Sequence, residues 1–142
     1  MNLNSIYTEI ITEQSRSKHN HHHTENPTSV TNGINPSCGD ELTLEIREKD
    51  GIIEDASFVG DGCAISMASA SIMIDMIKGR TVEEAKKLAQ LFMDMIHVRV
   101  TDEDELEPLG DAVALKDISH MPARVKCAVL SWHTLEESQK NR

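Results

Sequence analysis

The chain has 142 residues, a formal net charge of −10 at pH 7, 39% hydrophobic residues and 3% aromatic residues. This length is typical of one domain, here residues 1–142, with a core large enough to form without disulfide bonds. The negative charge disfavours nucleic acid and anionic membrane surfaces as partners, and the sequence has neither a signal-peptide pattern nor an apolar run of about 18 residues, so we expect a cytoplasmic protein that binds proteins or cations.

The amino-terminal region combines a short periodic segment with a long polar one. Residues 6–13 carry isoleucines at helical spacing and predict an amphipathic helix. Residues 15–31 keep no apolar period, and we expect them to form a flexible loop. Four histidines lie in this loop: His19, His21, His22 and His23. Their spacing would suit a transition-metal ion, but a solvated loop is the simpler interpretation.

A β-hairpin is predicted in the middle of the sequence. Apolar and polar residues alternate over residues 42–46, which is typical of a strand with one buried face. Asp50 and Gly51 suit a tight turn, and residues 52–59 form the returning strand. Because Ile52 and Ile53 are adjacent apolar residues, we expect a bulge in this second strand.

Helices dominate the rest of the chain. Residues 64–78 place apolar side chains on one face, Gly79 is a natural stop, and Thr81 with Glu84 forms a capping box for a helix over residues 82–96. Residues 101–107 are acidic, residues 108–119 read as a short helix, and Pro122 interrupts the pattern. A last amphipathic helix is predicted over residues 123–137.

The three cysteines are the main candidates for chemistry. An odd number of cysteines without a secretion signal indicates reduced thiols that serve as ligands or nucleophiles. Cys38 lies in a polar turn, Cys63 at a strand-to-helix junction, and Cys127 near the start of the last helix, where the helix dipole and basic neighbours are expected to favour a thiolate. With Asp40 as a fourth ligand, this set suits zinc. The usual Cys-x-x-Cys pair is absent, so the fold must assemble the site.

Other interpretations of these residues remain open. A lone cysteine is often a small buried apolar residue, and for Cys63, at the head of an apolar helix, this interpretation is as strong as the ligand interpretation. Asp40 follows Cys-Gly and is also a common turn residue. Arg124 and Lys126 would ordinarily be a solvated helix face, but beside a thiol they could lower its pKa.

Three motifs together resemble one known family. They are residues 35–40 (NPSCGD), residues 60–66 (GDGCAIS) and residues 124–127 (RVKC). In this order they look like the NifU amino-terminal/IscU family of iron–sulfur cluster assembly proteins. IscU-type scaffolds have a histidine directly before the third cysteine, whereas this chain has Lys126. Residues 101–120 are also an insertion relative to IscU-type relatives. In both features the chain is similar to the zinc-bearing SufU branch.

The resemblance implies an α+β fold in which a small antiparallel sheet packs against helices. It further implies zinc held by Cys38, Asp40, Cys63 and Cys127, and a partner cysteine desulfurase, a pyridoxal-phosphate enzyme of the SufS type that carries sulfur as a persulfide. In such relatives the desulfurase supplies a ligand that frees the first cysteine, here Cys38, to accept sulfur. Arg124 matches a basic residue that supports this exchange.

Three functions follow from the resemblance. The first is a zinc-dependent, sulfurtransferase-like acceptor that passes persulfide sulfur to downstream iron–sulfur assembly proteins. The second is a scaffold on which an iron–sulfur cluster is built and transferred. The third is an interaction module with structural zinc that stimulates its partner. Lys126 and the insertion favour the first. In IscU-type relatives the third cysteine is a strong candidate for the residue that accepts sulfur, so Cys127 remains an alternative to Cys38.

Overall fold

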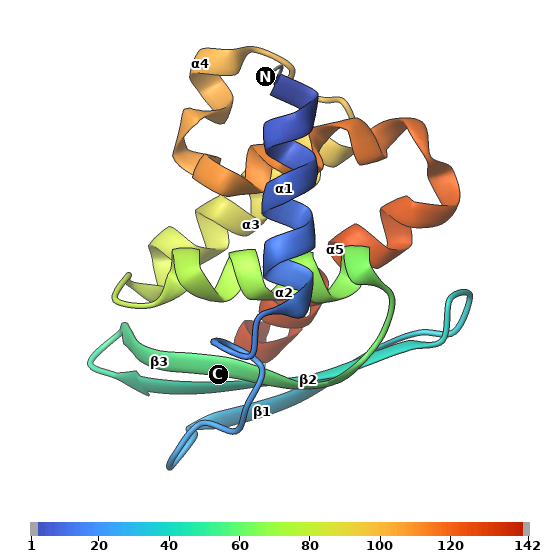
Figure 1. Ribbon diagram of the computed structural model, residues 1–142. Helices are drawn as coiled ribbons and strands as arrows, with labels where there is room; N and C mark the ends of the chain where they lie inside the picture. Colours follow the sequence, from blue (N-terminus) through green and yellow to red (C-terminus); the bar gives the residue numbers. More distant parts are fainter. Residues whose placement is uncertain (1–2, 141–142) are drawn as a thin grey trace.

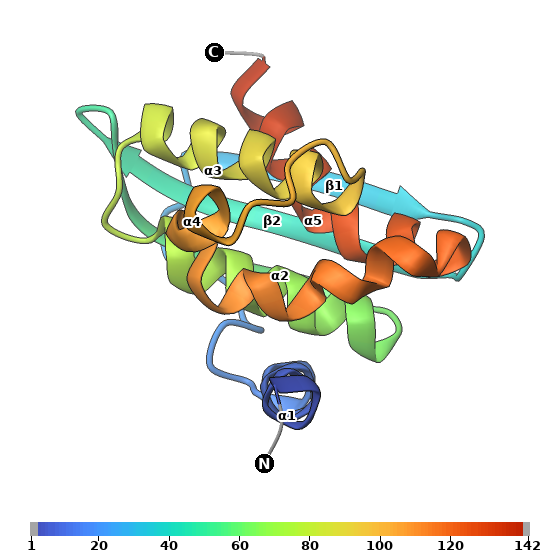
Figure 2. The same ribbon diagram turned by 90° about the horizontal axis from the view of Figure 1, so that it is seen from above.

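A computed structural model describes residues 3–140 of the protein, with all helices on one face of a single sheet (Figures 1 and 2). The α+β prediction is confirmed. The elements in chain order are α1 (Leu3–Arg16), β1 (Ser29–Asn35), β2 (Asp40–Lys49), β3 (Ile52–Asp61), α2 (Ala64–Ile77), α3 (Val82–Ile96), α4 (Glu103–Leu106), the 3-10 segment η1 (Glu107–His120) and α5 (Pro122–Lys140). No helix among these residues is both long and apolar enough to cross a membrane.

The sheet is antiparallel throughout, with strand order β1-β2-β3. Its inner face is apolar because Leu42, Leu44 and Ile46 alternate along β2 and are fully buried against the helices. The predicted hairpin turn is confirmed, since Asp50 and Gly51 both have positive φ, 55° and 79°. The pairing shifts from Arg47–Asp55 to Glu48–Ile53, which leaves Glu54 unpaired and places the expected bulge in β3.

The amino-terminal prediction was wrong in its boundaries. Helix α1 runs to Arg16, and β1 begins at Ser29, so the connection is shorter than the predicted loop of residues 15–31. Buried Asn20 fixes this connection, because its side-chain amide donates to the Ser71 carbonyl at 2.9 Å and its own carbonyl accepts from the Phe58 N–H at 3.0 Å. The predicted flexibility of the exposed part stays a prediction.

The helical half follows the predicted order with two corrections. The capping box at Thr81 and Glu84 is present, and α3 has the predicted bounds. Residues 107–120, however, form 3-10 turns broken at Gly110, which has a φ of 51°, rather than a regular helix. Pro122 begins α5 instead of interrupting it, because proline fits the first helical position, where its missing N–H costs no hydrogen bond.

Helices α2 and α5 carry the centre of the core. In α2 small and apolar side chains are buried around most of the helix, so α1 and α5 both pack closely against it. The Trp132 ring of α5 stacks on Phe92 of α3 with ring centroids 4.3 Å apart. Helix α5 also packs against β1, and this brings its first turns to the end of the sheet where β1 turns into β2.

Candidate metal centre

Three of the predicted ligands meet at the end of the sheet. Cys38 lies in the turn between β1 and β2, Asp40 is the first residue of β2, and Cys127 lies in α5. Their ligand atoms are all within 4.8 Å of one another, and the Cys38 and Cys127 sulfurs are 3.2 Å apart. Within residues 3–140 this is the one group of three or more Cys, His, Asp or Glu side chains close enough to hold a metal ion.

Asp40 links the three parts of the site. Its side chain is buried, its Oδ1 accepts a hydrogen bond from the Cys63 backbone N–H at 2.9 Å, and its Oδ2 accepts from Asn35 Nδ2 at 3.1 Å. Burial alone raises the pKa of the carboxyl, but hydrogen bonds from Cys63, Ser66, Cys127 and Asn35 outweigh it and lower the pKa. A stable carboxylate is therefore held beside the thiols.

Cys63 lies next to this group without being part of it. It is the N-cap residue of α2, its thiol is half-buried, and its Sγ is 3.5 Å from Ser66 Oγ. Burial raises the pKa of this thiol, but hydrogen bonds from Ser66 and Cys127 more than compensate and lower it. These contacts place Cys63 beside Cys127, and its role as a metal ligand stays a prediction.

The other two thiols differ in exposure. Cys127 is fully buried, and this burial, together with hydrogen bonding to Cys38 and Asp40, raises the pKa of its thiol. The prediction that the helix dipole and basic neighbours make Cys127 a thiolate was wrong for the protein alone, because desolvation outweighs them. Cys38 is exposed on its turn, and Gly39 beside it adopts a φ of 71° that glycine takes without strain.

Two basic residues precede Cys127 on α5. Arg124 is exposed, and its pKa is raised by a hydrogen bond to Cys127 and by the nearby charges of Cys63 and Cys38. It therefore lies where the resemblance implies, although its role stays a prediction. Lys126 is exposed on the side of α5 that faces β1.

The histidines of the loop do not gather into a metal site. His19 is 3.2 Å from Asp75, His21 is 2.9 Å from the Gly60 carbonyl, and His23 is 2.6 Å from Glu45. Each imidazole has a different partner, so they act as separate contacts that tie the loop to α2 and the sheet.

Asn35 is a site residue to which the sequence reasoning gave no role. It is buried, it donates to Asp40, and its Nδ2 is 3.7 Å from Cys127 Sγ. The available signal in the sequence was its position at the start of the 35–40 motif. The structure explains its role, because a buried side-chain amide needs hydrogen-bond partners.

Comparisons with known proteins point to one family. The family model of the NifU-like N terminal domain matches residues 6–134. The zinc-dependent sulfurtransferase SufU of Bacillus subtilis (strain 168) is 41% identical over 96% of this chain and 90% of its own length. The iron–sulfur cluster assembly scaffold protein IscU of Thermotoga maritima is 40% identical over 95% of this chain and 93% of its own length.

A solved structure has the same fold over nearly all of the chain. The crystal structure of FiSufU, an iron–sulfur cluster assembly scaffold protein for the SUF system from the thermophile Fervidobacterium islandicum AW-1, superimposes with a TM-score of 0.87 at 39% sequence identity. The match covers 98% of this chain and 100% of that one. The similarity therefore includes the sheet, the helices and all three cysteine-bearing segments.

Proposed function

This chain belongs to the family of NifU-like N-terminal domains, which serve iron–sulfur cluster assembly, and on that premise we propose that it is a zinc-dependent sulfur acceptor. It takes persulfide sulfur from a cysteine desulfurase in the cytoplasm and passes it to downstream iron–sulfur assembly proteins. It is a sulfurtransferase-like acceptor rather than an enzyme in the ordinary sense. The observation that carries this proposal is the exposed Cys38 thiol 3.2 Å from the buried Cys127 thiol, beside the Asp40 carboxylate.

The donor set fits zinc. Cys38, Asp40 and Cys127 offer two sulfurs and a carboxylate oxygen within 4.8 Å of one another. Cys63, whose backbone N–H donates to Asp40, is the residue that would supply a fourth ligand. Sulfur-rich ligands of this kind suit zinc and iron better than magnesium or calcium. Bound zinc would keep the thiols deprotonated and lower their nucleophilicity until a partner arrives.

Cys38 is the better candidate for the first sulfur acceptor. Its thiol is exposed on a turn, where a partner can reach it, whereas Cys127 is fully buried. In the proposed step the Cys38 thiolate attacks the terminal sulfur of the donor persulfide. A new S–S bond forms at Cys38, the S–S bond of the donor breaks, and the donor cysteine leaves as a thiolate, so no external oxidant or reductant is needed.

Two neighbours support this exchange. Asp40 is held by hydrogen bonds from Cys63 and Asn35, and it stays in place while the Cys38 turn moves. The Arg124 guanidinium lies beside the thiols and stabilises negative charge as the Cys38 thiolate forms.

A scaffold function is the second candidate. The same three cysteines can ligate a cluster, and the 40% identical Thermotoga relative bears the scaffold name. Lys126, where scaffolds of this family are expected to carry a histidine, favours sulfur transfer. A purely structural zinc module is a weaker candidate, because a structural site does not need an exposed ligand on a glycine-containing turn.

Metal analysis and one substitution test the proposal. Protein purified in air should contain about one zinc per chain and show no visible absorption, whereas a brown protein with labile sulfide would favour the scaffold. Cys38→Ala should lose acceptance of sulfur from a desulfurase, and Ser37→Ala, on the same exposed turn, should retain it. If Cys38→Ala accelerated desulfurase turnover as the parent does, the role given to Cys38 would be wrong.

A further inference from the structure

The two edges of the sheet are covered differently. The outer edge of β3 is bridged at both ends, by His21 against Phe58 and by Thr81 against Ile52. The outer edge of β1 pairs with no strand or bridge within residues 3–140. An uncovered edge presents unpaired backbone N–H and C=O groups that can bind a further strand.

Strand β1 also lacks the usual protection of an edge strand. Its sequence, SVTNGIN, contains no charged residue and no proline. Val30 and Ile34 are large apolar residues on its outer face and are 61% and 59% exposed. An added strand would bury them through cross-strand contacts on that face.

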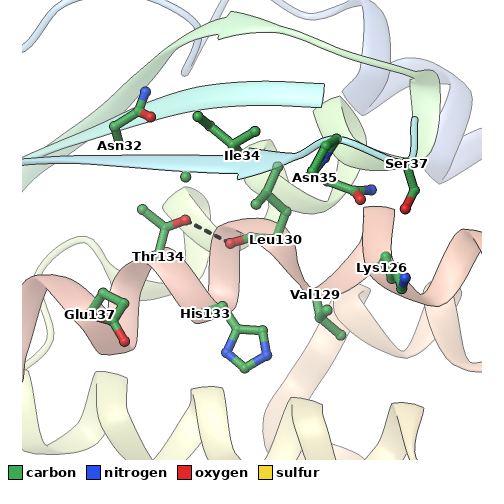
Figure 3. Close-up of a pocket in the computed structure, with 12 residues that line it drawn as sticks. Asn32, Ile34, Asn35, Ser37, Lys126, Val129, Leu130, His133, Thr134 and Glu137 are labelled. Atoms are coloured by element: carbon green, nitrogen blue, oxygen red, sulfur yellow. Dashed lines mark hydrogen bonds between the residues drawn. The ribbon is translucent and has the colours of Figure 1, made fainter. Parts of the chain in front are cut away.

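A groove with a volume of about 500 Å³ runs along this edge, between β1 and α5 (Figure 3). Ile34 and Asn35 line it on the β1 side, and Lys126, Leu130 and His133 line it on the α5 side. The lining continues through Pro36 and Ser37 and so reaches the turn that carries Cys38. An occupant of the groove would therefore contact the segment that holds the acceptor thiol.

The charges along the groove are uneven. Lys126, at the end nearest Cys127, is exposed and forms no salt bridge with the rest of residues 3–140. Glu137, farther along α5, already pairs with Lys140 at 3.0 Å. The groove thus fits an extended peptide with an apolar side chain against Leu130 and a carboxylate at Lys126.

We propose that the β1 edge and this groove bind an extended segment of the sulfur donor as a fourth strand of the sheet. The inference rests on the proposed function and names the docking surface for that partner. The donor is favoured over a second copy of this chain because the groove leads to the Cys38 turn, and because two copies, each with a net charge of −10, repel each other. Docking on β1 would couple partner binding to movement of the turn that follows β1.

Hydrogen exchange on the complex with a SufS-type cysteine desulfurase tests main-chain pairing directly. Amides in Ser29–Asn35 that exchange quickly in the free protein should be protected in the saturated complex. The double variant Val30→Lys/Ile34→Lys should bind the desulfurase at least tenfold more weakly, with unchanged zinc content and melting temperature. Ile52→Lys on the bridged edge of β3, where Ile52 is 44% exposed, is the matched control and should bind normally.

The outcomes separate this inference from the proposed function. If the parent accepts sulfur while the β1 amides exchange equally in the free and bound protein, the docking surface is wrong and the proposed function stands. If the parent neither binds the desulfurase nor accepts sulfur, both fail. If sedimentation shows that the free protein is a dimer with protected β1 amides, a second copy occupies the edge and the inference is overturned.

Discussion

A single buried hydroxyl should carry a measurable share of the stability between α2 and α5. Ser69 is fully buried in α2. Its Oγ donates to the Ala128 carbonyl at 2.6 Å and accepts from Trp132 Nε1 at 2.9 Å. These two bonds fix the alignment of the helices that begin near Cys63 and carry Cys127. Ser69→Ala removes both bonds while keeping the helix propensity of the position high.

The cost can be estimated from the groups left behind. The Ala128 carbonyl keeps its helical environment, so losing the hydrogen bond from Ser69 costs about 1 kcal/mol, the net value of one hydrogen bond. The Trp132 indole N–H is left buried without a partner, at a cost of about 1–3 kcal/mol. Ser69→Ala should therefore lower the free energy of unfolding by about 2–4 kcal/mol.

Ser131→Ala is the matched control. Ser131 is 1% exposed, lies in α5, and its Oγ has no hydrogen-bond partner within residues 3–140. Removing this hydroxyl should change the free energy of unfolding by less than about 0.5 kcal/mol or raise it. Urea denaturation of the zinc-loaded proteins, followed by fluorescence of the one tryptophan, measures both. Equal effects of the two substitutions, or a Ser69→Ala effect below about 0.5 kcal/mol, would refute the reasoning.

Three further predictions concern packing, pH and metal. Gly33→Ala places a methyl group against the buried Thr134 side chain. The free energy of unfolding, measured by thermal denaturation, should therefore fall by about 1–3 kcal/mol. The Glu84 carboxyl has a pKa below its ordinary 4.5 because it accepts a hydrogen bond from the Thr81 N–H. Its stabilising contribution is present above the unfolded pKa and is lost as pH falls through the folded one. Glu84→Gln should therefore be less stable than the parent at pH 7, and the difference should shrink as the pH falls below 4.5. Removing zinc with a chelator should lower the melting temperature, because three distant segments lose the metal ion that joins them. Re-addition of zinc should restore the melting temperature.

The elements with strong periodic patterns were predictable from sequence. Strand β2, helix α3 and the turn at Asp50 and Gly51 follow directly from apolar periodicity, a capping box and turn chemistry. Strand β1 was not predicted because its large apolar residues lie on the solvent-facing side of the sheet, the reverse of the usual pattern. Val30 and Ile34 face outward, while Thr31 and Gly33 face α5, where close packing leaves room for small side chains only.

The sequence reasoning brought Cys38, Asp40 and Cys127 together correctly, but the finer properties of this group are set by tertiary contacts. Spacing in the sequence could not show that Asp40 joins Asn35 to the Cys63 segment, since these contacts depend on how the sheet end meets α2. The protonation of Cys127 was misjudged for the same reason. Its burial is decided by packing of α5 on β1 and α2, and burial outweighs the helix dipole that the sequence displays.

The most direct test of the account is the location of the transferred sulfur. The zinc-loaded protein is mixed with a cysteine desulfurase and cysteine labelled with heavy sulfur, quenched by alkylation within one turnover, and mapped by peptide mass spectrometry. A heavy persulfide is expected on Cys38 before any other position, and no heavy persulfide is expected at residue 38 of the Cys38→Ala variant. Heavy sulfur that appears first on Cys127, or only as acid-labile sulfide with iron, would contradict the account.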